Sequence, residues 1–432
     1  MLKIEIPYAK NIKEYFYIKK NNTFKLLEPE ISRIEDNNID EEAIINSSME
    51  KPIESLKLEE LIKFDTKIAI IVDDITRPTP THKILPILLK RIKNIQTDFK
   101  KITIIIANGS HRKHSPKEKI QLLGRKVFEE IKVVDHDAYN DEDLISIGKT
   151  KRGTPIKVNK DVVNSDVRIL IGLIKPHIDA GYSGGGKSIL PGVCGIETIM
   201  HNHSFNAVNS PYTRAGVIEG NPIRDDIEDA SSKLKPNFIL NVILNNKLKI
   251  IHAVAGDIIK AHREGIKLIE KIVKVKVNKR YDGAIIGCSY PYNLDFVQSL
   301  GVLSIVHRIS NPVVKKDGVL VLISACSEGF GSVCIESFIK KNPNPHKMLE
   351  IISKQNYFMD GQWCVQVLAE ILMNYKVIMV TKGLDPKDII AMGAIYKAKA
   401  QQAINYLLKE LGEDKEFIIL PEAAYTLPVL EY

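Results

Sequence analysis

Three apolar runs constrain the fold of this chain more than any other feature. They are KIAIIV at residues 67–72, KITIIIA at 101–107 and VRILIGLI at 167–174. Their apolar residues follow one another directly instead of alternating with polar ones, which is typical of strands buried on both faces of a parallel sheet. Helical patterns over 81–95 and 115–130 lie between them. Strands that alternate with helices predict a doubly wound α/β domain.

The strand rhythm begins again near residue 281, which indicates a second domain. Its strands are expected within YDGAIIGCS (281–289), DGVLVLISACS (317–327) and YKVIMVTKG (375–383). Helices are expected over 345–354 and 386–411. We therefore predict an α/β protein of two α/β domains with mostly parallel sheets and the active site in the cleft between them.

Composition limits the remaining possibilities. The 432 residues suffice for two or three domains of about 150 residues each. No apolar run approaches the roughly 20 residues that span a bilayer, and the first residues lack the pattern of a signal peptide. A cytoplasmic location without a membrane partner is therefore expected. The five cysteines contain no CxxC pair, so neither a disulfide framework nor a structural zinc site is indicated.

The net charge of +8 is spread along the chain. The clearest cationic cluster, KIVKVKVNKR at 271–280, alternates in polarity and is more typical of a strand or linker than of a nucleic-acid-binding arm. We therefore expect no nucleic-acid partner.

Polar residues follow each of the three buried runs directly. Asp74 and Arg77 follow the first run, His111 the second and His177 the third. In an open parallel sheet the carboxyl ends of the strands line the ligand crevice. We therefore expect these four side chains to meet in one cleft.

A glycine-rich segment comes next, GYSGGGKS at 181–188. It fits the phosphate-binding pattern G-x-x-x-x-G-K-S. However, residues 176–180 separate it from the strand, and Pro191 arrives too soon for a helix to continue. We favour a loop whose glycines let the backbone pass close to a bulky ligand and present Lys187 as a covalent anchor or phosphate contact. A P-loop nucleotide-binding protein stays as an alternative.

Several motifs, in order along nearly the whole chain, together resemble the nickel-dependent lactate racemase family of 2-hydroxyacid racemases and epimerases. They are DDITRPTP, ANGSHR, KPHIDAGYSGGGKSILPG, the Asn202-His203 pair, IEGNP, the Gln298 region and the Gln362-Trp363 pair. A set of linked motifs is more specific than any one of them alone.

The resemblance implies a distinctive cofactor, a pyridinium-3,5-bisthiocarboxylate mononucleotide whose two sulfur-bearing arms hold nickel. It implies that the cofactor is covalently bound to Lys187 and that His203 is a further nickel ligand. The other residues that it assigns to cofactor binding are Asp74, Gly184, Gly185, Gly186 and Ser188. Separate accessory enzymes make the cofactor in the family, so these enzymes are expected partners.

The resemblance also implies an isomerase that inverts the C2 centre of a small 2-hydroxy acid by hydride transfer to and from this cofactor. His111 and His177 would be the acid/base groups, and Arg77, Gln298 and Trp363 would bind the substrate. Residues 1–275 would then form the catalytic and cofactor-anchoring domain, and residues 276–432 the domain that closes the substrate cleft.

The residue types suit this chemistry independently. The hydrogen on C2 is too weakly acidic to leave easily as a proton, whereas its removal as hydride, with the hydroxyl proton taken by a base, gives a planar 2-keto acid. Inversion then needs an acid/base group on each side, and histidine titrates near the working pH. Arginine binds a planar carboxylate through two parallel hydrogen bonds. Sulfur and imidazole are suitable ligands for nickel.

Two departures from the family pattern concern the substrate. The lactate-specific pattern has an aromatic residue, then glutamine, then lysine three places on, whereas this chain has Val297, Gln298 and Gly301. Ser110 replaces the usual threonine before His111. We therefore expect a substrate whose substituent is larger than that of lactate or differently charged. A non-catalytic homologue that binds the cofactor or a hydroxy acid is the remaining alternative.

Overall fold

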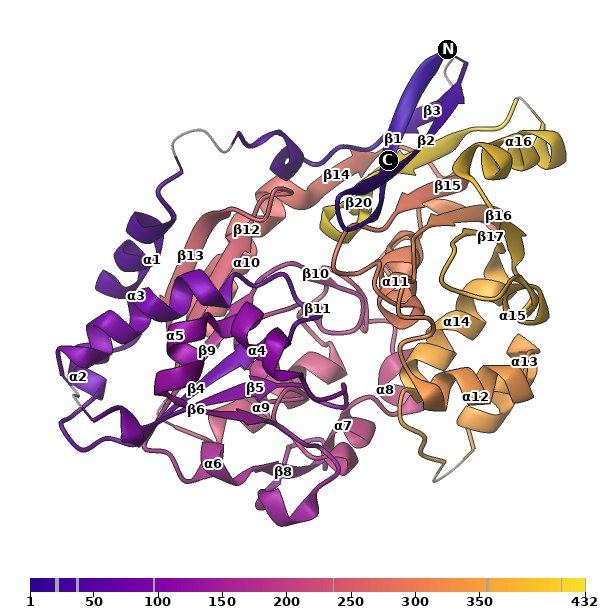
Figure 1. Cartoon of the computed structure of the whole chain (residues 1–432). Helices are drawn as coiled ribbons and strands as arrows, with labels where there is room; N and C mark the ends of the chain where they lie inside the picture. The colour runs from indigo at the N-terminus through magenta and orange to yellow at the C-terminus, as the bar shows by residue number, and fades with distance from the viewer. Residues whose placement is uncertain are drawn as a thin grey trace.

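The computed structural model describes residues 1–19, 23–35, 39–95, 98–235, 237–354, 357–412 and 414–431. Two six-stranded sheets, both with mostly parallel strands, form the cores of two α/β regions (Figure 1). The predicted fold class is confirmed. No helix within the described ranges is long and apolar enough to cross a membrane.

The first sheet has the strand order β13-β12-β9-β4-β5-β6. The strands are β4 (Ile68–Asp73), β5 (Ile102–Ala107), β6 (Lys132–Asp135), β9 (Val167–Leu173), β12 (Asn237–Leu244) and β13 (Ile250–Gly256). All pair in parallel except β13, which is antiparallel to β12. The three strands predicted from their apolar runs are confirmed, and β4 lies between β9 and β5. Their carboxyl ends therefore meet at one edge.

Helices cover both faces of the first sheet, as the doubly wound prediction requires. On one face, buried residues of α1 (Glu41–Glu50), α3 (Thr81–Lys93) and α4 (Pro116–Leu123) pack against the strands. On the other face, α7 (Ile196–Asn202), α9 (Pro222–Ser232) and the start of α10 (Lys260–Val273) do so.

The single helix predicted over 115–130 is wrong in one respect. Gly124 has a left-handed φ of 86° and separates α4 from α5 (Arg125–Glu130). The predicted start of this helix is confirmed, because Ser115 is the N-cap of α4. Its side chain accepts a hydrogen bond from the backbone N–H of Glu118.

The second sheet has the strand order β18-β17-β16-β15-β19-β3, all parallel. The strands are β3 (Phe24–Leu26), β15 (Tyr281–Gly287), β16 (Val314–Ile323), β17 (Lys376–Val380), β18 (Ile395–Lys397) and β19 (Phe417–Leu420). The three strands predicted here are confirmed. Because β3 pairs with β19, a segment near the start of the chain joins the second sheet. The division of the chain between residues 275 and 276 stays a prediction.

Helices also cover this sheet. On one face lie α11 (Phe296–Leu303), α12 (Val333–Lys341), α13 (Pro345–Ile352) and α14 (Gln362–Asn374). On the other lie α16 (Ala400–Leu411) and the hairpin of β1 (Leu2–Ala9) and β2 (Ile12–Ile18).

The prediction of one helix over 386–411 is wrong. α15 (Pro386–Ala391) ends before Gly393, whose φ of 93° is left-handed, and β18 then pairs with β17 before α16 begins. A single glycine and a three-residue edge strand thus replace the middle of the expected helix.

Short elements complete the chain. They are α2 (Leu58–Leu61), α6 (Lys160–Val163), α8 (Phe205–Asn209) and the paired strands β7 (Leu144–Lys149) with β8 (Pro155–Asn159), β10 (Pro176–His177) with β11 (Gly181–Tyr182), and β14 (Lys274–Val277) with β20 (Leu427–Leu430). The cationic run at 271–280 ends α10 and then forms β14, so it is a strand over part of its length.

Candidate active site

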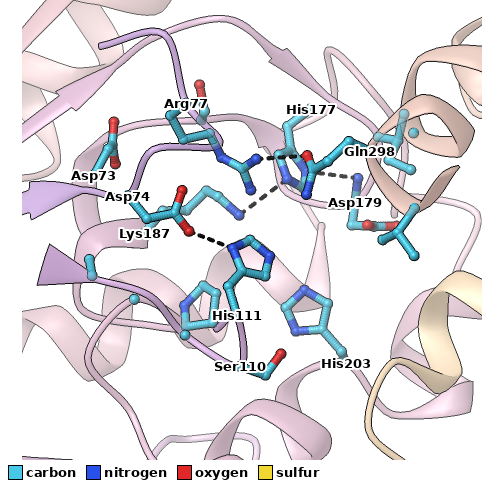
Figure 2. Close-up of a pocket in the computed structure, with 18 of the residues that line it drawn as sticks. Asp73, Asp74, Arg77, Ser110, His111, His177, Asp179, Lys187, His203 and Gln298 are labelled. Carbon is cyan, nitrogen blue, oxygen red and sulfur yellow. Dashed lines mark hydrogen bonds and ion pairs between the residues drawn. The ribbon is translucent and has the colours of Figure 1, made fainter. Parts of the chain in front are cut away.

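A cavity of about 200 Å³ lies between the two regions. Residues that follow β4, β5 and β9 line one side, and residues of α11 and α14 line the other. This is the predicted position, in the cleft between the domains. Ten predicted site residues line the cavity: Asp74, Arg77, His111, His177, Gly184, Lys187, Ser188, His203, Gln298 and Trp363. Figure 2 shows the imidazoles, the guanidinium and the amine converging from separate segments.

His111 and Asp74 form a pair at one side of the cavity. The Nδ1 atom of His111 lies 2.5 Å from Oδ2 of Asp74, and Oδ1 of Asp74 accepts hydrogen bonds from the backbone N–H and hydroxyl of Thr76 at 2.9 and 2.6 Å. Burial alone would raise the pKa of the Asp74 carboxyl, but His111 and the charge of Arg77 outweigh it and hold the pKa below its usual range. Asp74 is therefore an anion that accepts the Nδ1 proton, which leaves Nε2 of His111 free.

His177 has the opposite arrangement of hydrogen bonds, because its Nδ1 atom is an acceptor and not a donor. Its Nδ1 accepts hydrogen bonds from the backbone N–H groups of Asp179 and Ala180, both at 3.2 Å. The neutral ring therefore carries its proton on Nε2, which lies 3.3 Å from Nζ of Lys187. Burial and then the charge of Lys187 lower the pKa of His177 well below its usual value. In their neutral forms His111 thus presents a lone pair at Nε2, and His177 presents an N–H.

Lys187 lies on a 3-10 turn, Gly185–Ser188, at the base of the cavity. Burial and then the charges of Arg77 and Arg224 lower the pKa of its amine to about 7. A large fraction of the Lys187 amine is therefore unprotonated, and so nucleophilic, near neutral pH.

The three glycines before Lys187 serve close packing. A Cβ on each would come within 3.0 Å of a neighbouring atom; the nearest are Oδ1 of Asn241 at 2.7 Å for Gly184, Cγ of His262 at 2.8 Å for Gly185 and Oγ of Ser231 at 2.1 Å for Gly186. Gly184 lines the cavity, whereas Gly185 and Gly186 are not among its lining residues. They lie against the elements that support the loop.

This loop does not have the geometry of a P-loop. A P-loop leads directly from a strand into a helix, whereas here β10 and β11 intervene after β9 and the next α-helix, α7, begins only at Ile196. The phosphate-binding alternative is therefore wrong as a structural interpretation.

Arg77 and Gln298 join the two sides of the cavity. Nη1 of Arg77 donates to Oε1 of Gln298 at 2.9 Å, and also to Oγ1 of Thr76 at 3.1 Å. Within the described ranges the Arg77 guanidinium forms no ion pair with a carboxylate at contact distance. Its charge is therefore available to an anionic ligand, and Gln298 fixes its orientation.

His203 and Trp363 form the opposite end of the lining. Their rings lie 5.0 Å apart at 47°, and His203 is buried, with an Nδ1 atom that has no hydrogen-bond partner in the described part of the chain. Burial lowers the pKa of His203 to about 4, so the imidazole is neutral and able to bind a metal. No group of three or more His, Cys, Asp or Glu side chains among the described residues could hold a metal. A metal at His203 would thus take most of its ligands from a bound group, as far as the described residues are concerned.

Lys175 and Asp73 are charged residues that also line the cavity beside the predicted ones, as does Asp179, which pairs with Arg308. Lys175 has its ammonium 4.1 Å from the ring centre of Tyr292, and burial and then Arg77 lower its pKa to about 7. Burial raises the pKa of Asp73 to about 6, although its carboxylate accepts a hydrogen bond from Thr79 at 2.6 Å. Sequence reasoning did not assign these two residues to the site. Their positions at the ends of β9 and β4 were the available signal.

A buried arginine supports the His177 segment from the other domain. Arg308 has an exposed fraction of 0%, and its guanidinium binds Asp179 at 3.3 Å and Glu370 at 2.7 Å. It also donates to the carbonyl oxygen of Val208 at 2.9 Å. Nothing in the sequence around Arg308 indicated this role.

Fold and cavity together define a two-domain α/β protein whose candidate active site lies between the domains. Comparison with known proteins shows the family to which it belongs. Residues 8–216 match the model of the lactate racemase N-terminal domain, and residues 288–426 match that of the lactate racemase C-terminal domain. A lactate racemase from Thermoanaerobacterium thermosaccharolyticum is 31% identical over 424 residues, and one from Lactiplantibacillus plantarum is 29% identical over 424 residues; each match covers 98% of both chains.

Solved structures agree. The lactate racemase apoprotein from T. thermosaccharolyticum superposes with a TM-score of 0.90 at 31% identity, covering 99% of this chain and 100% of that one. A protein from Thermotoga maritima shares the fold, with a TM-score of 0.72 at 19% identity over 92% of this chain and 100% of that one. The chain belongs to the lactate racemase family. It is an isomerase that acts as a racemase.

Proposed function

We propose that this isomerase inverts the C2 centre of a small 2-hydroxy acid, with His111 and His177 as acid/base groups and a lysine-tethered nickel-pincer nucleotide as cofactor. The observation that carries the proposal is the convergence of two imidazoles, a guanidinium and an amine of lowered pKa in one cavity. The two imidazoles and the guanidinium follow separate strands, and the amine comes from the glycine-rich loop. Together they can bind a carboxylate, exchange a hydroxyl proton and hold a covalent group.

Arg77 would bind the substrate carboxylate. Its guanidinium lacks a carboxylate partner at contact distance in the described ranges, and Gln298 holds one of its nitrogens at 2.9 Å. An oriented guanidinium can donate two parallel hydrogen bonds to a carboxylate, which fixes the plane of the substrate. Trp363 would pack beside the substrate, since it lines the cavity next to His203.

His111 would accept the hydroxyl proton of one enantiomer at Nε2, because Asp74 already binds Nδ1. His177 would be the acid/base group on the other side and would meet the C2 oxygen through Nε2, because backbone N–H groups occupy its Nδ1. When bound, the cofactor supplies a hydride acceptor and donor for C2. The substrate passes through a planar 2-keto acid, whose two faces are open to the two imidazoles in turn.

Lys187 would form the covalent link to the cofactor through its amine, which is unprotonated to a large extent near neutral pH. His203 would be the protein ligand of nickel. A neutral imidazole that belongs to no group of three or more potential ligands among the described residues suits a metal whose other ligands include the sulfur atoms of the cofactor. Gly184 and Ser188 would contact the cofactor from the cavity wall, whereas Gly185 and Gly186 would hold the loop from behind. Asp74 would act mainly through His111.

The partners of this proposal are a small 2-hydroxy acid and the accessory enzymes that make the cofactor. The test is to produce the chain anaerobically with nickel and those enzymes. Intact mass should show an adduct that Lys187→Ala removes and that Lys126→Ala, at an exposed position outside the cavity, keeps. Chiral chromatography should show racemisation of at least one 2-hydroxy acid. Folded protein with no adduct, no nickel and no turnover would refute the proposal.

A further inference from the structure

Gly301 lies in α11, where neither its conformation nor its packing requires a glycine. Its φ is outside the left-handed region, and an added Cβ would meet no atom within 4 Å. The other glycines with equally open surroundings, Gly124, Gly148, Gly153 and Gly393, all have a positive φ that explains them. Glycine within a helix is less stable than alanine. The missing side chain at Gly301 therefore leaves space that a larger residue would fill.

That space belongs to the candidate active site, because Gly301 lines the same cavity as Arg77 and His177. Its neighbours in the lining are apolar: Val297 and Leu300 on α11, and Val367 on α14. The two helices pack against each other, so these side chains form one continuous surface. Among the described residues, no charged side chain of the second domain lines the cavity.

The position of Gly301 relative to Gln298 indicates which part of a ligand would use the space. Gln298 and Gly301 are three residues apart on the same helix, so they lie on one face. Gln298 binds the guanidinium of Arg77. A 2-hydroxy acid whose carboxylate lies at Arg77 would therefore be bound beside the turn of α11 that carries Gly301.

We infer that the preferred substrates of this enzyme are 2-hydroxy acids whose C2 substituent is apolar and larger than a methyl group, and that Gly301 provides the space for it. This inference rests on the proposed function. It names the substrate class of that same site, since the charged groups lie on the first-domain side and the substituent faces the apolar side.

The first measurement compares substrates on the cofactor-loaded enzyme. We expect kcat/KM to rise at least about tenfold from lactate to 2-hydroxybutanoate or 2-hydroxy-4-methylpentanoate, because additional apolar groups in a matching pocket contribute this much. Malate, which carries a second carboxylate, should be poorer than either. A preference for lactate or malate would overturn this inference and leave the proposed function standing, whereas no turnover of any acid by loaded enzyme would overturn both.

The second measurement fills the space. Gly301→Leu should lower the ratio of kcat/KM for 2-hydroxy-4-methylpentanoate to kcat/KM for lactate about tenfold or more, with Gly301→Ala between. Both changes favour the helix, so the melting temperature should not fall. Met373→Ala, on α14 outside the cavity lining, is the matched control and should keep the wild-type preference.

Binding can be read without turnover. Propanoate and 4-methylpentanoate lack the hydroxyl group and cannot be racemised, so calorimetry on the loaded enzyme reports their affinities alone. We expect 4-methylpentanoate to bind about tenfold more tightly than propanoate, and Gly301→Leu to abolish the difference. Equal affinities in the wild-type enzyme would contradict the assignment of Gly301.

Discussion

The two sides of the cavity come from different kinds of element and differ in chemistry. On the first side, the strand ends and the segments that follow them carry all the acidic, basic and histidine lining residues that the structure describes, from Asp73 to His203. On the second side, the flanks of α11 and α14 contribute Gln298 and otherwise mainly apolar side chains. Loops at strand ends can bring groups from distant parts of the chain together, and the sheet holds them in place. The backbone groups of a helix are already hydrogen-bonded within the helix. Its flank therefore offers a ligand mainly the shape formed by its side chains.

This comparison predicts the largest losses for the imidazoles of the first side. His111→Ala and His177→Ala should each reduce racemisation about 10²- to 10⁴-fold, the usual contribution of an acid/base group, without removing the adduct on Lys187. Chiral chromatography and intact mass measure the two properties. His201→Ala should stay active, because His201 packs against Phe358 outside the lining. An active His177→Ala enzyme would show that the proton exchange is one-sided.

The burial of Lys187, together with the cationic groups near it on the first side, should be visible in the titration of its amine. In protein made without the cofactor, pulse acetylation of this amine should have its midpoint near pH 7, whereas an ordinary lysine titrates near about 10.4. The amine is protonated and unreactive below the midpoint and reactive above it. Arg77→Gln should move the midpoint upward, because Arg77 is one of the charges that lower this pKa. A midpoint near pH 10, read by peptide mass spectrometry, would show that burial and the neighbouring cations do not lower the pKa of Lys187.

Asp74→Asn should have a smaller effect than loss of an imidazole. The amide no longer favours the Nδ1–H form of His111, so kcat should fall about a hundredfold while KM changes little. Steady-state kinetics on the loaded enzyme test this. Asp137→Asn removes a surface carboxylate that pairs with Lys113 at 2.7 Å and should leave kcat unchanged. If both variants behave alike, Asp74 does not act through His111.

The smallest effect is expected on the second side. Gln298→Ala removes the acceptor of Arg77 and should raise KM about tenfold, which corresponds to about 1.4 kcal/mol, with a lesser change in kcat. Kinetics over a range of substrate concentrations separate the two constants. A large fall in kcat with constant KM would mean that Gln298 takes part in the chemistry. The second side would then do more than bind the substrate.

The first sheet could be predicted from the sequence because its strands are buried on both faces. The runs that became β4, β5 and β9 are continuous in apolar residues, and the polar residues at their ends had to meet once the strands were adjacent. Four of the twelve predicted site residues, Asp74, Arg77, His111 and His177, line the cavity for this reason, whereas the six others that line it were expected from the glycine-rich segment and from the family resemblance. The remaining two, Gly185 and Gly186, belong to the same loop but face its support.

Other features depend on contacts that no local pattern contains. Gly124 and Gly393 interrupt helical patterns, and a lone glycine in such a pattern is often tolerated. β3 is only three residues long and acquires its strand structure from β19. The sequence around Arg308 is that of an ordinary charged residue. Its side chain is buried only because both domains pack around it.

The burial of Arg308 bears on how ligands reach the cavity. Separating the domains at this point would leave the buried Asp179 without the guanidinium of Arg308, and breaking a buried pair costs about 3–5 kcal/mol. Across a larger outer cleft, Tyr139 and Asp360 are joined by an exposed hydrogen bond of 2.6 Å. The outer cleft shares His111 and Trp363 with the inner cavity. Of these two contacts between the domains, the buried one at Arg308 is therefore the costlier to break, and the exposed one between Tyr139 and Asp360 at the outer cleft is the easier.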